Sequence, residues 1–194
     1  MSIGAVILAA GASSRLGRPK QLEQFEGESL LRRTARVALE GDCEPVLVVL
    51  GANADVSCAE IVDLPVRVLH HEQWSTGMAS TISCGVAALP PNAEGAILLV
   101  CDQPHLSAAL LHDLLARRGA PNTIIASRYA DTVGVPALFE RVHFTELIEL
   151  SGDVGAKSLF AKHANATTVV NFPRGAVDID SPADAAALAA QQRA

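Results

Sequence analysis

The sequence predicts an α/β protein in which helices cover both faces of a mostly parallel β-sheet, giving three layers. Short aliphatic runs recur along the 194 residues, and several are apolar at every position. Such runs are typical of parallel strands that are buried on both faces. Segments with helical spacing of apolar residues separate the runs. This alternation of strand and helix is the pattern of βαβ units.

The expected elements follow one another in chain order. Strands are expected at 5–8, 46–50, 66–69, 96–100, 123–125 and 168–170, and helices at 30–39, 80–89, 106–117, 144–150 and 183–190. Ser107 precedes an Ala/Leu-rich run and is a predicted N-cap. Ser181, Pro182 and Asp184 supply a cap, a first-turn proline and an acid at the third position, so the last helix should begin near Pro182. Glycine and proline clusters fall between elements, which predicts a single domain over residues 1–194.

Composition excludes several classes of protein. With 49% hydrophobic and 19% charged residues, the chain is an ordinary globular sequence, neither disordered nor fibrous. Its longest apolar runs, such as 5–10 and 96–101, reach about a third of the roughly 20 residues that a membrane helix needs. A net charge of -6, 4% aromatic residues and the lack of a basic tract argue against nucleic-acid binding. The N-terminus from Met1 to Gly4 enters a strand-like run without a basic segment, so we expect no secretory signal and a cytoplasmic location.

The four cysteines show no metal-binding or disulfide spacing. They are Cys43, Cys58, Cys84 and Cys101, and no two form a Cys-x-x-Cys pair. This pattern fits reduced thiols in a cytosol, where each cysteine acts as a small buried hydrophobe.

A glycine-rich loop, residues 11–20, follows the first strand directly. Ligands in α/β folds bind at the carboxyl ends of strands, where this loop lies. A Walker A loop needs four residues between its glycines, but five separate Gly11 from Gly17, and Arg18 follows. A dinucleotide fingerprint needs a third-position glycine, which is Ser13 here, so a nicotinamide-dependent oxidoreductase is also disfavoured.

The same loop concentrates positive charge. Arg15, Arg18 and Lys20 fall within six positions, beside glycine-freed backbone N–H groups that can face an anion. The loop is therefore either a phosphate cradle or a plain surface turn with solvated charges.

Two aspartates are candidates for a metal site. Asp102 directly follows the strand-like run 96–101, and Asp180 precedes the last helix, so both carboxylates can meet at the carboxyl edge of the sheet. Mg²⁺ is commonly held by one or two carboxylates together with substrate phosphates. The alternative is that Asp102 is a loop or cap residue and that Asp178 is a turn residue. Whether Asp178 or Asp180 would be the second ligand stays open.

Six blocks of the sequence resemble one protein family. Residues 8–20 closely resemble the opening signature of the MobA-like nucleotidyltransferases, which attach a nucleoside monophosphate to a phosphorylated acceptor. The resemblance continues in the family's order through blocks 77–85, 101–104, 134–139, 152–157 and 178–182. It implies a Rossmann-like nucleotidyltransferase fold. The sequence departs from the family pattern at Leu16, Thr81 and Val135.

The resemblance also implies an activity. The Ala9-Ala10 pair and block 101–104 look like the cytidylyl-transferring members that act on the molybdenum cofactor; guanylyl-transferring members typically carry a second glycine where Ala10 stands. We therefore expect transfer of CMP from CTP to the phosphate of the molybdopterin cofactor, with Mg²⁺ as cofactor and release of pyrophosphate. A molybdoenzyme of the xanthine dehydrogenase type is a further expected partner. Alternatives are guanylyl or another nucleotidyl transfer to a related phosphate or sugar-phosphate, and a non-catalytic carrier of the finished cofactor.

Site residues are carried over from the family by position. Arg15, Lys20 and Asp102 are the expected catalytic residues, Asp102 and Asp180 the metal ligands, and Gly152, Asp153 and Lys157 the acceptor-binding residues. The expected nucleotide-binding residues are Leu8, Ala9, Ala10, Gly11, Ser13, Ser14, Arg15, Lys20, Gly77, Ser80 and Asp102.

Simpler interpretations exist for some of these residues. Gly77 and Ser80 also fit the start of a helix, and Lys157 fits an exposed helix position. His70, His71 and His105 lack ligand-like spacing and are expected to be surface or loop residues. No catalytic histidine is required, because a phosphomonoester has its second pKa near 6 and is already largely ionised at pH 7.

Overall fold

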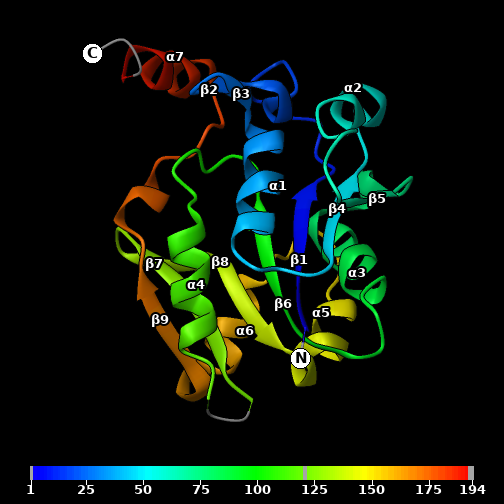
Figure 1. The fold of residues 1–194 in the computed structure, drawn as a ribbon, viewed down its shortest axis with the longest axis vertical. Coiled ribbons are helices and arrows are strands. Elements are labelled where there is room, and N and C mark those ends of the chain that lie inside the picture. Colours follow the sequence, from blue (N-terminus) through cyan, green and yellow to red (C-terminus); the bar gives the residue numbers. More distant parts are fainter. Residues whose placement is uncertain (1, 120–121, 192–194) are drawn as a thin grey trace.

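The computed structural model describes residues 2–119 and 122–191, so Met1 and the last three residues of the predicted 1–194 domain lie outside the described residues. Its main sheet has seven strands in the order β5-β4-β1-β6-β8-β7-β9, and β2 and β3 form a separate two-stranded sheet (Figure 1). The strands are β1 Ser2–Ala9, β2 Gln24–Phe25, β3 Glu28–Ser29, β4 Val46–Leu50, β5 Arg67–His70, β6 Ala93–Val100, β7 Ile124–Tyr129, β8 Thr132–Glu140 and β9 Thr167–Asn171.

Seven α-helices and several short 3-10 turns connect these strands in the described residues. The helices are α1 Leu30–Glu40, α2 Ala54–Ala59, α3 Met78–Ala87, α4 Ala108–Ala116, α5 Phe144–Ile148, α6 Lys157–Lys162 and α7 Pro182–Gln191. The 3-10 turns are η1 Lys20–Leu22, η2 Trp74–Thr76, η3 Arg141–His143, η4 Ala164–Ala166 and η5 Pro173–Ala176. Every predicted helix and strand is present, with ends shifted by a few residues.

The predicted, mostly parallel sheet is confirmed. β1 pairs parallel with β4 and β6, β4 with β5, and β7 with β9. Sequence reasoning missed β8, which pairs antiparallel with β6 and β7. Gly134 and Pro136 mask the strand pattern, because both residue types are uncommon inside strands. The pairing with β7 skips Val135 and Pro136, and this bulge accommodates the proline.

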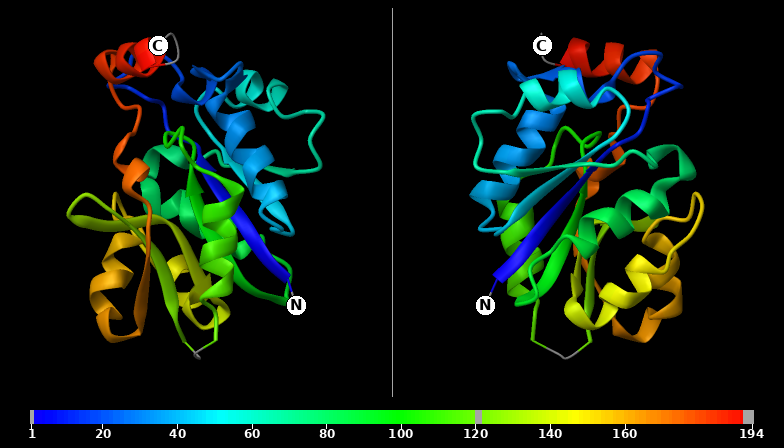
Figure 2. Two further views of the ribbon diagram at one scale, coloured as in Figure 1. Left: turned by 60° about the vertical axis from the view of Figure 1, so that its left-hand side comes forward. Right: turned by 90° about the vertical axis from the view of Figure 1, so that its right-hand side faces the viewer.

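Alternate residues of β1 enter two different cores. Ile3, Ala5 and Ile7 pack with α1 and α4, whereas Val6 and Leu8 pack with α3, α5 and α6. This period of two is the alternation expected of a strand that is covered on both faces. Figure 2 shows α1 on one side of the sheet and α3 and α5 on the other. The three predicted layers are therefore present.

The strand order defines a place for a ligand. From β1 the chain adds β4 and then β5 on one side, and it returns to add β6 on the other side of β1. The carboxyl ends of β1 and β6 therefore flank the point where the strand order reverses, which is where α/β sheets bind ligands. The loop after β1 and Asp102 after β6 both lie at this point.

Capping side chains fix the ends of two helices as predicted. Ser107 Oγ accepts a hydrogen bond from the Leu110 amide at 3.3 Å. At α7 the Ser181 amide donates to Asp184 Oδ2 at 2.8 Å, and the Asp184 amide donates to Ser181 Oγ at 3.3 Å. This reciprocal capping box holds the segment that carries Asp180.

The four cysteines are unpaired, as expected from their spacing. Cys43 and Cys101 are buried, and burial raises the pKa of each thiol to about 12. Cys58 and Cys84 are only partly buried, so the expectation of full burial holds for two of the four. In the described part of the chain, no helix has the length and apolar character that crossing a bilayer requires.

Candidate functional site

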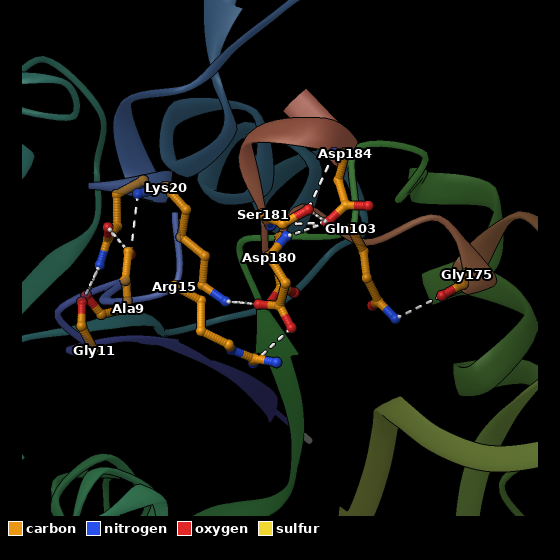
Figure 3. Close-up of polar contacts among 12 residues, drawn as sticks. Ala9, Gly11, Arg15, Lys20, Gln103, Gly175, Asp180, Ser181 and Asp184 are labelled. Carbon is orange, nitrogen blue, oxygen red and sulfur yellow. Dashed lines mark hydrogen bonds and ion pairs between the residues drawn. The ribbon is translucent and has the colours of Figure 1, made fainter. Parts of the chain in front are cut away.

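The loop after β1 is held in shape by two side chains. Gln21 is 1% exposed, and its Nε2 donates to the carbonyls of Ala9 and Gly11, each at 2.9 Å (Figure 3). Ser13, at φ 54°, accepts a hydrogen bond from the Lys20 amide on its Oγ at 3.0 Å. Side-chain hydrogen bonds therefore hold the backbone of this loop in one conformation. Sequence reasoning missed Gln21, because only the folded loop shows what its amide holds.

Opposite charges meet at the mouth of this loop. Lys20 Nζ lies 2.5 Å from Asp102 Oδ2 and 3.1 Å from Asp180 Oδ1, and Arg15 lies 2.7 Å from Asp180 Oδ2. Figure 3 shows the side chains of Arg15 and Lys20 pointing toward Asp180. These residues come from three distant segments, so the predicted convergence of the two carboxylates is present in the structure.

The electrostatics of this cluster keep the lysine charged. Burial alone would lower the pKa of Lys20, but the negative charges of Asp102 and Asp180 outweigh burial, and the pKa is raised. Burial raises the pKa of Asp178, and the nearby charges of Asp102 and Asp180 raise it further. Asp102 and Asp180 both face the Lys20 ammonium, so the geometry favours Asp180 over Asp178 as the partner of Asp102.

The third basic residue of the loop points elsewhere. Arg18 forms an exposed ion pair with Glu23, and the side-chain hydrogen bond and the charge of Glu23 raise the pKa of Arg18. Of the three clustered basic residues, Arg15 and Lys20 face the carboxylates, and Arg18 does not.

A cavity of about 190 Å³ surrounds the charge cluster. It contains most of the residues that were expected to bind the nucleotide, together with Gln21 and both carboxylates. Its lining includes Leu8, Ala9, Gly11, Ser13, Ser14, Arg15, Lys20, Gln21, Met78, Asp102 and Asp180.

A second cavity adjoins the first and lies beside η2 and the start of α3. Ala10 and Gly77, the other expected nucleotide contacts, line it with Trp74 and Asp153. Ser80 is not among the described residues that line these cavities. Its Oγ donates to the Gly77 carbonyl at 2.8 Å and lies 2.8 Å from His71 Nε2, so it shapes the helix start instead.

A third, mostly apolar cavity lies on the other side of Met78. Tyr129, Val135 and Phe160 line it, and Lys157 lies at its edge with Nζ donating to Thr132 Oγ1 at 2.7 Å. The expected acceptor-binding residues are thus divided, because Asp153 lines the cavity beside Trp74 and Lys157 lines the apolar one.

Leu8 and Met78 line all three cavities, which together form one cleft along the sheet edge. Met78 is 41% exposed, so part of its side chain is open to the cleft. Its position within block 77–85 was a signal for a functional role, yet apolar side chains carry no chemistry that a sequence pattern can single out.

Replacing Gly77 with alanine should destabilise the protein. Gly77 has φ 117°, and an added Cβ would clash with the Gly152 carbonyl oxygen, so the residue lets the 152–153 loop pack on the start of α3. We expect the free energy of unfolding of Gly77→Ala to fall by about 1–3 kcal/mol, measured by urea denaturation. The matched control is Gly155→Ala, whose Cβ would approach Met78 only to 3.9 Å. Equal stability of the two variants would contradict this role of Gly77.

The sequence matches known proteins along most of its length. Residues 5–167 match the MobA-like NTP transferase domain. Nicotine blue oxidoreductase from Paenarthrobacter nicotinovorans is 36% identical over 162 residues, 78% of each chain. Purine catabolism protein PucB from Bacillus subtilis is 30% identical over 79% of this chain and 78% of its own length. A probable molybdenum cofactor guanylyltransferase from Synechococcus elongatus is 36% identical over 57% of this chain and 56% of its own.

Solved structures share the whole fold. Rv0371c from Mycobacterium tuberculosis, in a complex with manganese, superposes with a TM-score of 0.80 at 29% identity, over 97% of this chain and 98% of that one. A nucleotidyl transferase from Methanothermobacter gives a TM-score of 0.85 at 20% identity, over 98% and 97% of the two chains. These likenesses extend beyond the matched domain to the C-terminal segment that carries Asp180.

Proposed function

Because the chain belongs to the MobA-like NTP transferase family and is a nucleotidyltransferase, we propose that it transfers CMP from CTP to the phosphate of the molybdopterin-type molybdenum cofactor. The observation that supports the proposal best is the charge cluster at the carboxyl ends of β1 and β6. There a lysine and an arginine from a fixed glycine-rich loop meet two carboxylates inside a cavity.

The proposed reaction is an in-line displacement at the α-phosphorus of the nucleotide. An oxygen of the acceptor phosphate forms a bond to the α-phosphorus as the bond to the pyrophosphate oxygen breaks, and pyrophosphate leaves with that electron pair. Lys20 and Arg15 stabilise the charge on the triphosphate, and the backbone N–H groups of the loop bind its oxygens. No side chain needs to remove a proton, because the acceptor phosphate is already largely ionised.

The carboxylates of Asp102 and Asp180 fit a Mg²⁺ ion. Both present an oxygen to the same ammonium group, at 2.5 and 3.1 Å, so they face a common point. Carboxylate oxygens are the ligands that Mg²⁺ prefers, with substrate phosphates completing its shell. Such an ion would supply Lewis-acid stabilisation of the phosphate charge. Lys20 pairs with both carboxylates. Its ammonium group can turn from them to bind the triphosphate.

The three cavities can be assigned to parts of the two substrates. The triphosphate occupies the cavity with Arg15 and Lys20, and the nucleoside occupies the one beside Trp74 and Gly77. The apolar cavity suits the flat pterin ring, and Lys157 at its edge suits the acceptor phosphate. Lys157 is exposed and bonded only to a neutral threonine among the contacts described, so it can turn toward an anion.

Two other functions define the alternatives to be tested. Transfer of a guanylyl or another nucleotidyl group would use the same cleft, and one relative bears the name of a molybdenum cofactor guanylyltransferase. Another relative bears the name of an oxidoreductase, although Ser13 breaks the dinucleotide fingerprint in this chain. After transfer, the product would pass to a molybdoenzyme of the xanthine dehydrogenase type.

Thermal unfolding with added nucleotides separates these alternatives. Thermal unfolding is measured with CTP, GTP, ATP, UTP or NADH, with and without Mg²⁺. Each ligand is added at about 100 times the dissociation constant expected for its complex with the protein. We expect CTP with Mg²⁺ to stabilise the fold by about 2.7 kcal/mol, raising Tm by about 5–10 °C. A larger shift with GTP would replace the cytidylyl assignment, and a shift with NADH alone would overturn the transferase assignment. Pyrophosphate release with the molybdenum cofactor as acceptor then tests the second substrate.

A further inference from the structure

A second group of side chains able to bind a metal lies outside the three cavities of the cleft, between α5 and the end of α6. His143 ends η3, Glu146 lies in α5, and His163 follows α6. β8 runs antiparallel to β6, and its last residue, Glu140, pairs with Gly95 near the start of β6. The group therefore lies near the sheet edge opposite the carboxyl ends of β1 and β6. We propose that His143, Glu146 and His163 bind a divalent transition-metal ion of the zinc type.

The three side chains point at a common centre. One ligand atom from each lies within 4.8 Å of the other two. His163 Nε2 lies 2.9 and 3.0 Å from the two Glu146 oxygens, and His143 Nδ1 lies 3.9 Å from Glu146 Oε1. Small side-chain rotations would place all three around one ion at zinc-ligand distances of about 2.0–2.2 Å.

The buried histidine holds its two ring nitrogens against different partners. His143 Nε2 lies 3.0 Å from the carbonyl oxygen of Asn122, which can only accept, so Nε2 carries the hydrogen. Nδ1 is the nitrogen that faces Glu146, at 3.9 Å from its Oε1. Metal-bound histidines almost always donate their other N–H to a carbonyl or carboxylate in this way, which fixes ring orientation and tautomer. Asn122 thus completes a site of which His143 is the buried member.

The donor set selects the ion. Two imidazole nitrogens and one carboxylate suit Zn²⁺ and leave a fourth position for water, whereas Mg²⁺ prefers oxygen ligands. Glu146 and His163 are each about a quarter exposed, so an ion can enter from solvent. The two metal sites of the protein would therefore differ in chemistry, with Mg²⁺ at Asp102 and a zinc-type ion here.

Lys162 pairs with the carboxylate of the proposed site. Its Nζ lies 2.6 Å from Glu146 Oε2, and its side chain is 64% exposed. The ammonium group therefore lies on the carboxylate oxygen that the ion would need. An entering ion would displace the ammonium group into solvent, and Lys162 therefore competes with the metal for Glu146.

A bound ion would link α5 to α6, the helix that forms part of the cleft wall. His163 is the C-cap of α6, and two residues within that helix, Lys157 and Phe160, line the apolar cavity. The described residues that line the three cavities of the cleft do not include His143, Glu146 or His163. The ion would therefore join α6 to α5 and stiffen the wall of the cavity without taking part in the reaction.

Zinc titration of the whole protein tests the proposal by calorimetry, in excess Mg²⁺ to fill the carboxylate site. We expect wild type to bind one Zn²⁺ with a rise in Tm, and Co²⁺ to give a tetrahedral absorption spectrum. Glu146→Gln and His163→Gln should each weaken zinc affinity by about 10–100-fold or more, given that even loss of an outer-shell partner costs that much. Lys162→Gln should tighten it.

Three comparisons keep the test decisive. His112→Gln removes a histidine on α4 that pairs with Asp42, and it should leave zinc affinity unchanged. Asp102→Asn should also leave it unchanged, and loss of zinc binding in that variant would place the ion in the cleft and overturn the proposal. Unchanged affinity in Glu146→Gln and His163→Gln would overturn it as well. Lys162 is exposed, so Lys162→Gln folds even where a histidine variant does not, and weaker binding there would contradict the competition.

Discussion

Lys20→Ala should lose about 10²–10³-fold in kcat for pyrophosphate release, the loss typical of removing one electrostatic donor to a developing charge. Lys20 Nζ lies between Asp102 and Asp180 in the cavity proposed for the triphosphate, and the two carboxylates keep it protonated. Without it, the cavity keeps Arg15 but loses one of the two cations proposed to stabilise the charge on the leaving pyrophosphate. KM for the nucleotide should change less than kcat, because the interaction strengthens in the transition state.

The matched control is Arg18→Ala in the same loop. Arg18 pairs with Glu23 on the surface and does not face the carboxylates, so its removal should change kcat by less than about threefold. Lys20→Ala also leaves Asp102 and Asp180 facing each other, so the Tm of each variant is measured to exclude unfolding. A loss below threefold in a folded Lys20→Ala protein would contradict the role proposed for Lys20.

The fold could be predicted from the sequence because its signals are local. Fully apolar strands such as β4 and capping residues such as Ser107 and Ser181 act within a few residues of their own position. β8 could not be found this way, since Gly134 and Pro136 interrupt its pattern and the bulge opposite β7 becomes visible only once the strands pair. A bulge is a tertiary feature that a local pattern cannot contain.

The charged part of the site was predictable, and its supports were not. Arg15 and Lys20 are conspicuous as basic residues in a glycine-rich loop, and Asp102 is conspicuous directly after a buried strand. Gln21 holds the loop through carbonyls of Ala9 and Gly11, and a sequence shows no preference for such a contact. Met78 joins three cavities that exist only in the folded protein.

The group of His143, Glu146 and His163 could not be predicted from the sequence either. His143 and Glu146 are three residues apart, but His163 is 17 residues further along, beyond any common ligand spacing. α5 and α6 bring them together, because both helices pack on the same face of the sheet.

Asp102→Asn should abolish Mg²⁺-dependent turnover, with a loss in kcat greater than that of Lys20→Ala. The amide keeps the shape of the side chain but removes a negative charge, and Mg²⁺ binds weakly without charged oxygen ligands. The shift in Tm that CTP and Mg²⁺ produce together should shrink toward the value with CTP alone, which separates loss of the ion from loss of the nucleotide. Pyrophosphate release and thermal unfolding over a range of Mg²⁺ concentrations measure both effects.

Two neighbouring aspartates provide the comparison for Asp102. Asp180→Asn should also weaken the Mg²⁺ dependence, because Asp180 faces the same ammonium group as Asp102 and also binds Arg15. Asp178→Asn should have a smaller effect, since burial and the neighbouring carboxylates already raise the pKa of Asp178, and loss of its charge relieves repulsion within the cluster. Normal turnover in Asp102→Asn would remove Asp102 as the metal ligand. A larger loss in Asp178→Asn than in Asp180→Asn would assign the second carboxylate to Asp178.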